Sequence, residues 1–186
     1  MTRTNSHSRY YRRDHARGFT LVEAVIGLAI LAIIMTLAAP SFASWIGSQR
    51  VRATAEALIE GMRAAHSEAL KRNATVDFVL TDDDPTSATA TPGTTARGWQ
   101  VRSTESPAQV VRGRISADTV ASVQIGSTLG SLRFSGTGRT VPTGTSLTIN
   151  VTSNVPDSRA LRVVVTPGGS IRSCDPAVAA TDPRGC

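Results

Sequence analysis

The stretch RGFTLVEAVIGLAILAIIMTLAA, residues 17–39, joins a short Gly-Phe motif and one glutamate to a long aliphatic run. No charged residue occurs between Ala24 and Gln49. A helix over residues 19–44 would be about 39 Å long at about 1.5 Å per residue, longer than the roughly 30 Å hydrocarbon core of a bilayer. We therefore expect residues 19–44 to form a single membrane-crossing helix.

The segment before this helix is basic. Residues 1–18 hold five arginines against Asp14 alone, so they carry +4 of the formal net charge of +6. Basic residues next to an apolar helix stay on the cytoplasmic side, which leaves the C-terminal part of the chain in the periplasm. The positive charge of the whole chain is thus a topology signal, and it does not by itself indicate nucleic-acid binding.

A removed secretory signal peptide, cut after Ser41-Phe42-Ala43, is the alternative. Two observations favour a retained helix. Glu23 lies at the entrance of the apolar run, where a carboxylate costs about 2.5–3.5 kcal/mol at mid-bilayer and less near the interface. A disposable signal has no need of such a residue. The amphipathic pattern also continues past the apolar run without a break.

The motif formed by residues 17–23, set between a basic leader and an apolar helix, resembles the type IV pilin and pseudopilin superfamily. This resemblance covers residues 13–72. It implies that a prepilin peptidase cuts between Gly18 and Phe19 and N-methylates Phe19. It also implies that the chain joins other pilins or pseudopilins in a helical filament, with the help of an inner-membrane assembly platform. Pro40 matches the position of a helix proline in the family, and we expect a kink there because proline lacks an N–H and crowds the carbonyl of Thr36.

Cleavage would give Glu23 a partner. It creates a positive α-amine at Phe19, and in a packed filament that amine and the Glu23 carboxylate of a neighbouring subunit would neutralise each other. A buried charge without a partner is strongly penalised, so this pair would favour one axial register over others. The alternative is that Glu23 merely benefits from its position at a helix N-terminus.

Residues 45–72 are expected to form the amphipathic half of the same helix. Apolar residues recur at three- and four-residue steps, namely Ala55, Leu58, Ile59, Met62, Ala65 and Ala69. Arg52/Glu56 and Glu68/Arg72 are candidate ion pairs on the charged face. Residues 73–186 change to a period of two and predict strands over 75–80, 98–102, 109–115, 120–125, 132–135, 147–151 and 161–166. The fold class is therefore α+β, a pilin-like fold in which a long helix packs on antiparallel sheet, with a polar loop over 81–97.

Little in the sequence points to catalysis, to a metal or to a cofactor. It has no Walker loop, no nucleophile elbow and no HExxH motif. The Asp82-Asp83-Asp84 run lacks the ligand spacing of a calcium loop, which favours a solvated turn, and His66 is a lone histidine on the helix. Cys174 and Cys186 are the two cysteines, and in an exported protein they predict a disulfide. We expect a structural protein and no enzyme.

The C-terminal region resembles the H-type pseudopilins of type II secretion (GspH) and the FimT-like minor pilins. FimT-like proteins carry a Gly-Arg-x-Arg motif associated with DNA binding during uptake. Here the matching residues are Gly169-Ser170-Ile171-Arg172, so the first arginine is replaced. Two functions stay open, a structural subunit of a type II secretion pseudopilus or type IV pilus, and a DNA receptor. The candidate DNA contacts are Arg159, Arg162, Arg172 and Arg184.

Overall fold

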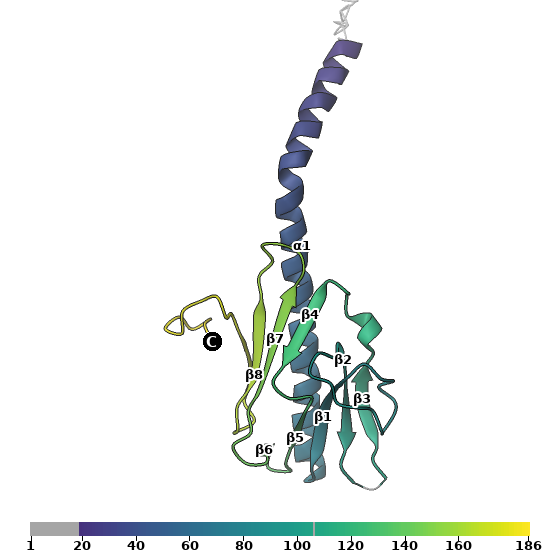
Figure 1. The fold of residues 1–186 in the computed structure, drawn as a ribbon, viewed down its shortest axis with the longest axis vertical. Helices are drawn as coiled ribbons and strands as arrows, with labels where there is room; N and C mark the ends of the chain where they lie inside the picture. Colours follow the sequence, from purple (N-terminus) through teal and green to yellow (C-terminus); the bar gives the residue numbers. More distant parts are fainter. Residues whose placement is uncertain (1–18, 106) are drawn as a thin grey trace, which may run out of the picture. The chain divides into compact units, whose positions relative to one another are not determined.

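The computed structural model describes residues 19–105 and 107–186. Gly18 and the predicted leader lie outside the described residues. The chain divides into two units, with the boundary between Ala39 and Pro40. Within the described residues, one α-helix, α1 (Leu21–Arg72), precedes nine strands and a short 3-10 turn, η1 (Ser116–Asp118). Figure 1 gives their order along the chain. The α+β class expected from the sequence is confirmed.

The strands form two antiparallel sheets. The first has the order β3-β2-β1-β5-β6, made of Val110–Arg114, Gly98–Ser103, Val76–Thr81, Ser131–Phe134 and Thr140–Val141. The second has the order β4-β7-β8-β9, made of Val123–Ser127, Leu147–Ser153, Leu161–Val165 and Ile171–Cys174. The seven strands expected from alternation are all present, with ends shifted by up to three residues. Strands β6 and β9 were not expected.

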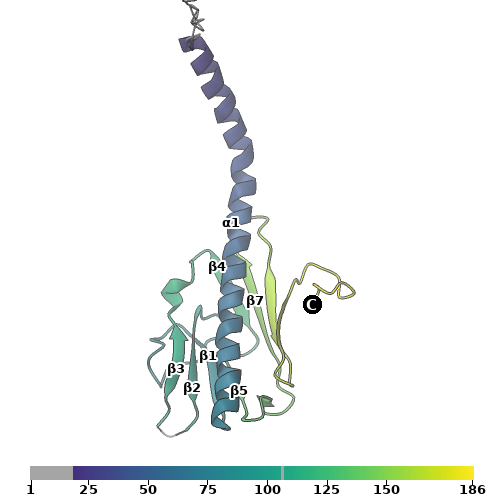
Figure 2. The ribbon, with the colours of Figure 1, turned by 180° about the vertical axis from the view of Figure 1, so that it is seen from behind.

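The C-terminal half of α1 supplies the centre of the core. All six residues of the predicted apolar stripe are buried, together with Val51. They share one cluster with inward side chains of both sheets, such as Phe78 on β1 and Ile149 on β7. Figure 2 shows this half of the helix crossing in front of strands from both sheets. The helix therefore joins two sheets that have no strand in common.

The charged face and the end of the helix also follow the sequence. The two expected ion pairs form, with Arg52 Nε 3.0 Å from Glu56 Oε1 and Arg72 Nε 2.6 Å from Glu68 Oε1. The helix ends where Asn73 takes a positive φ of 50°, a conformation that asparagine tolerates at helix C-termini. The amide of Ala74 then donates to the carbonyl of Ala69 at 3.2 Å.

The polar loop between β1 and β2 is organised by its three aspartates. Their carboxylates accept backbone N–H groups of the same loop, Asp82 from Arg97 at 3.0 Å, Asp83 from Thr91 at 2.7 Å and Asp84 from Thr86 at 2.9 Å. These bonds hold the loop across the outer face of the first sheet, where Arg102 donates to the carbonyls of Ala88 and Ala90.

A glycine in the middle of α1 makes the close approach of helix and sheet possible. Helix-interior glycine costs about 1 kcal/mol relative to alanine. At Gly61, however, an added Cβ would lie 2.8 Å from ring atoms of Trp99 on β2. The buried indole thus occupies the space that a side chain at this position would need.

We predict that Gly61→Ala destabilises the protein by about 1–3 kcal/mol despite its better helix propensity, because the indole must move within a packed core. Gly126→Ala is the matched control, since nothing lies within 4 Å of a Cβ added there. Urea unfolding of the full chain in detergent, followed by tryptophan fluorescence, measures both variants. A Gly61→Ala protein as stable as wild type would show that the indole contact does not constrain the helix.

Candidate functional site

The N-terminus of α1 is fixed by Thr20. Its Oγ1 accepts the backbone N–H of Glu23 at 3.2 Å, and its carbonyl accepts the N–H of Ala24 at 3.2 Å. Thr20 is therefore the N-cap, and Thr20-x-x-Glu23 has the spacing of a capping box. Sequence analysis missed this role, although the Thr-x-x-Glu spacing directly before an apolar run signals it. The cap uses the backbone of Glu23 and leaves its carboxylate exposed.

Phe19 and the apolar part of the helix are exposed along their length. Leu21, Leu28, Ile33 and Leu37 are each more than half exposed, and Phe19 is 81% exposed. Among the described residues, α1 is the one helix long and apolar enough to cross a membrane. Such a surface is not stable in water, so lipid or other protein has to cover it. The helix assignment continues through Pro40, and the kink expected there stays a prediction.

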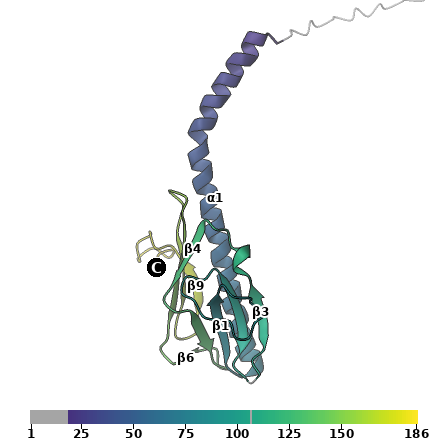
Figure 3. The ribbon, with the colours of Figure 1, turned by 45° about the vertical axis from the view of Figure 1, so that its right-hand side comes forward.

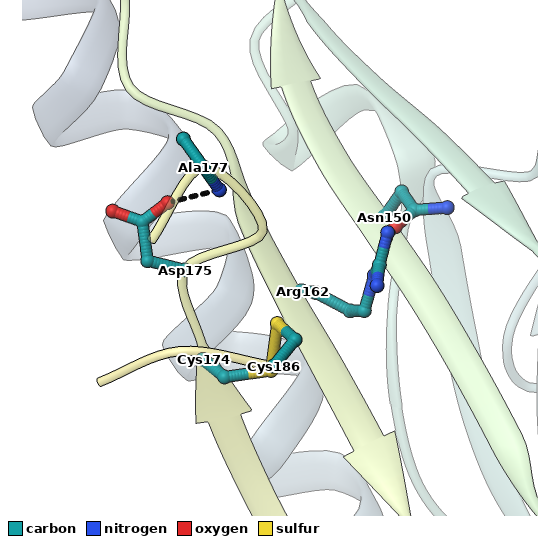
Figure 4. Close-up of a disulfide and its surroundings, with 6 residues drawn as sticks. All are labelled: Asn150, Arg162, Cys174, Asp175, Ala177 and Cys186. Carbon is teal, nitrogen blue, oxygen red and sulfur yellow. Dashed lines mark hydrogen bonds between the residues drawn. A yellow bond between two sulfur atoms is a disulfide. The ribbon is translucent and has the colours of Figure 1, made fainter. Parts of the chain in front are cut away.

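The C-terminal residues form a closed loop. A disulfide joins Cys174, at the end of β9, to Cys186, with Cα atoms 5.1 Å apart. Asp175 follows the first cysteine and is buried, and its carboxylate accepts the N–H of Ala177 at 2.9 Å (Figure 4). The N–H of Asp175 donates to the carbonyl of Arg184 at 2.7 Å. The loop is thus held both by the disulfide and by hydrogen bonds of the carboxylate and the backbone N–H of Asp175.

Asp175 also fastens this loop to the rest of the domain. Its second carboxylate oxygen pairs with Nε of Arg159, and the backbone N–H of Arg159 donates to Ser48 Oγ on α1 at 2.9 Å. The bond from the Ala177 amide, followed by the bond from Arg159, lowers the pKa of Asp175 against the opposing effect of burial. The sequence alone did not indicate this structural role of Asp175. An aspartate directly after a cysteine is not a pattern from which a buried ion pair can be predicted.

The four candidate DNA-contacting arginines do not gather into a free basic cluster. Arg159 pairs with Asp175, and Arg184 pairs with Asp182 at 2.9 Å, a contact that raises the pKa of Arg184. Arg162 donates to Asn150 Oδ1 at 2.8 Å on the outer face of the second sheet (Figure 4). Of the four, Arg162 and Arg172 have no acidic partner among the described residues. Because phosphate binding requires clustered positive charge, this arrangement does not favour the DNA-receptor alternative.

Gly169, the glycine of the partial Gly-x-x-Arg match, has a structural explanation. It has a φ of 85° in the turn between β8 and β9, and an added Cβ would lie within 2.0 Å of the carbonyl oxygen of Gly138. His66 lies beneath the same two glycines and packs edge-on against Phe134, with ring centroids 5.5 Å apart. Both the glycine and the lone histidine therefore serve the packing of two turns against the helix.

No group of three or more His, Cys, Asp or Glu side chains suited to a metal ion occurs in the part of the chain that the structure describes.

Comparison with known proteins identifies two family patterns. Residues 54–169 match the model of the type II transport protein GspH, and residues 13–39 match the prokaryotic N-terminal methylation motif. The sequence matches no curated protein.

Solved structures with a similar fold include the type IV minor pilin FimU of Pseudomonas aeruginosa in two crystal forms. One gives a TM-score of 0.54 at 17% identity, over 67% of this chain and 87% of FimU. The other gives 0.51 at 17% identity, over 73% and 98%. The minor pseudopilin EpsH of the Vibrio cholerae type 2 secretion system aligns with a TM-score of 0.49 at 16% identity, over 69% and 99%.

We predict that Asp175→Asn destabilises the protein by about 1–2 kcal/mol at neutral pH, because it removes a charged acceptor from two hydrogen bonds. A lowered pKa in the folded state means that the contribution is present above the unfolded value of about 3.9 and is lost as the pH falls through the folded value. The gap between variant and wild type should therefore close below about pH 4.

Asp182→Asn, which removes a more exposed carboxylate from its pair with Arg184, is the control and should have the smaller effect. Urea midpoints of the full chain in detergent at several pH values measure all three proteins. A deficit in Asp175→Asn that is unchanged at pH 3 would contradict a role for its charge.

Proposed function

Because the chain belongs to the family of the type II transport protein GspH, we propose that it is a minor pilin or pseudopilin subunit that is anchored in the bacterial inner membrane and then enters a filament. The observation that supports this proposal best is the order of three features along the chain. A methylation motif over residues 13–39 is followed by a helix with an exposed apolar surface, and the family's globular region follows over residues 54–169.

Cleavage between Gly18 and Phe19 by a prepilin peptidase is the first step of this proposal. The cap at Thr20 supports it, because helix α1 begins at Leu21 and leaves Phe19 outside the helix. A peptidase binds its substrate in an extended form, and Phe19 is not held in the helix. The basic charge of residues 1–18 supports a cytoplasmic N-terminus and a periplasmic globular domain.

Assembly then exchanges one apolar environment for another. In the membrane, lipid covers the exposed side chains of residues 19–39. In a filament, the same side chains pack against helices of neighbouring pilins or pseudopilins, delivered through an inner-membrane assembly platform. The filament is a type II secretion pseudopilus or a type IV pilus, because this chain matches the family of the type II transport protein GspH and its fold is similar to that of the type IV minor pilin FimU.

Glu23 selects the register of this packing. Its carboxylate is exposed on a helix surface that is otherwise apolar, and its backbone N–H is already bound by Thr20. Within a filament the carboxylate pairs with the methylated amine of Phe19 of a neighbouring subunit. A slipped register would leave both charges buried without partners, at a cost of about 3–5 kcal/mol for a broken buried pair.

We predict that Glu23→Gln leaves cleavage and membrane insertion intact but lowers the amount of this subunit in sheared filaments at least about tenfold. Glu56→Gln is the control, since Glu56 forms an exposed pair with Arg52 outside the apolar segment. Quantitative immunoblotting of the membrane and filament fractions measures both variants. Normal recovery of Glu23→Gln in filaments would exclude the pairing role.

A further inference from the structure

Two exposed aromatic side chains lie at the end of the apolar part of α1. Phe42 and Trp45 are 61% and 57% exposed. Their rings stack with centroids 5.8 Å apart, so they form one aromatic patch on one side of the helix. Two adjacent large rings facing water are unfavourable, whereas the headgroup boundary of a bilayer suits aromatic rings, above all tryptophan with its polar N–H.

The aromatic patch follows a stretch of helix about as long as the hydrocarbon core is thick, so it can lie at the headgroup boundary. Residues 21–39 of the helix are about 29 Å long at about 1.5 Å per residue, which matches the roughly 30 Å hydrocarbon core, and Phe42 follows three residues later in the chain. The first charged residues after Glu23 are Arg50 and Arg52, beyond the patch. Arg50 lies about 12 Å further along the helix than Phe42, beyond a headgroup layer of about 5–7.5 Å per leaflet and therefore in water.

A turn of the globular domain contacts the helix at the same level. Ser158, in the turn that connects β7 to β8, donates from its Oγ to the carbonyl of Ser44 at 3.4 Å. An added Cβ at Gly47 would meet that Oγ at 2.1 Å and the Cβ of Val155 at 3.1 Å. Figure 3 shows this turn as the end of the second sheet that approaches α1. Pro156, at its tip, is exposed.

From these contacts we propose that Phe42, Trp45 and residues 154–158, together called the interfacial surface, bind the headgroup region of the periplasmic leaflet. They fix the depth of the helix and hold the domain against the membrane before assembly. The inference rests on the membrane anchoring that is part of the proposed function. Lipid fits better than a second protein chain, because the aromatic patch lies between a charge-free segment long enough to cross the bilayer and the first arginines.

The two tryptophans of the chain allow a direct test. Trp99 is buried in the domain core and Trp45 belongs to the interfacial surface, so the fluorescence of wild type minus that of Trp45→Phe isolates Trp45. The full chain, purified from membranes, is reconstituted into phosphatidylcholine–phosphatidylglycerol vesicles whose acyl chains carry bromine either near the headgroup or near the bilayer centre. We expect shallow bromine to quench Trp45 at least about twofold more than deep bromine, and Trp99 to be unaffected by either.

Two further variants in the Trp45→Phe background extend the test. Pro156→Trp should be quenched by shallow bromine only. Leu70→Trp should be quenched by neither, because Leu70 is 47% exposed but lies about 38 Å further along the same helix than Trp45. Quenching of Pro156→Trp equal to that of Leu70→Trp would remove the turn from the interfacial surface.

The outcomes separate this inference from the function on which it rests. A chain that floats with the vesicles while Trp45 is quenched by aqueous iodide and by no lipid would overturn the inference alone. Equal or stronger quenching by deep bromine would overturn it too, because Trp45 would then lie within the hydrocarbon core. A chain that does not float with vesicles at all would overturn both the inference and the proposed membrane anchoring.

Discussion

The burial of one helical stripe, from Val51 to Ala69, is the interaction on which the globular domain depends. The two sheets have no strand in common. Buried side chains of both sheets pack in one cluster with the helical stripe, which therefore connects them. A side chain the size of Leu58 or Met62 contributes about 1.5–3 kcal/mol when fully buried, and the stripe supplies several such residues to a single cluster. Small residues have an equal part in this packing, because Gly61 admits the Trp99 indole and Ala65 is fully buried.

The apolar part of the same helix is under the opposite constraint, since nothing in the part of the chain that the structure describes covers it. Its exposed side chains need lipid or neighbouring helices, and both environments are nearly free of water. Any charge placed there has to have a specific partner. That requirement gives Glu23 its proposed role, and the N-cap at Thr20 leaves the carboxylate free for it. A membrane anchor and an assembly contact can therefore be the same segment, used at different times.

Much of this fold follows from periodicity, and the exceptions have physical reasons. The steps of three and four residues predicted the buried stripe, and alternation predicted seven of the nine strands. Strand β6 has only two residues, too few for a pattern. Strand β9, Ile-Arg-Ser-Cys, lies at the sheet edge with both central residues exposed, so its alternation is hidden. The Pro167-Gly168-Gly169 turn, which follows a clear strand, was the signal that a returning strand should come next.

Some residues of the candidate site could likewise be predicted from the sequence, and others could not. Gly18, Phe19 and Glu23 could be selected from the sequence because their motif is local. The pairing of Arg159 with Asp175 could not, since the partners come from different strand ends and meet only when the second sheet forms. A count of arginines near the C-terminus therefore overestimated the free positive charge. The glycine at 169 likewise belongs to a tight contact between turns, which no local motif encodes.

The intact mass of the protein extracted from membranes tests the central claim, that residues 19–44 are a retained anchor and assembly segment of a processed pilin-like subunit. We expect the mass of residues 19–186, increased by one CH2 unit for the N-methylation of Phe19 and reduced by two hydrogens for the Cys174–Cys186 disulfide. A chain that begins near Ser44 and is recovered in the soluble periplasmic fraction would contradict it, because the helix would then be a discarded signal peptide.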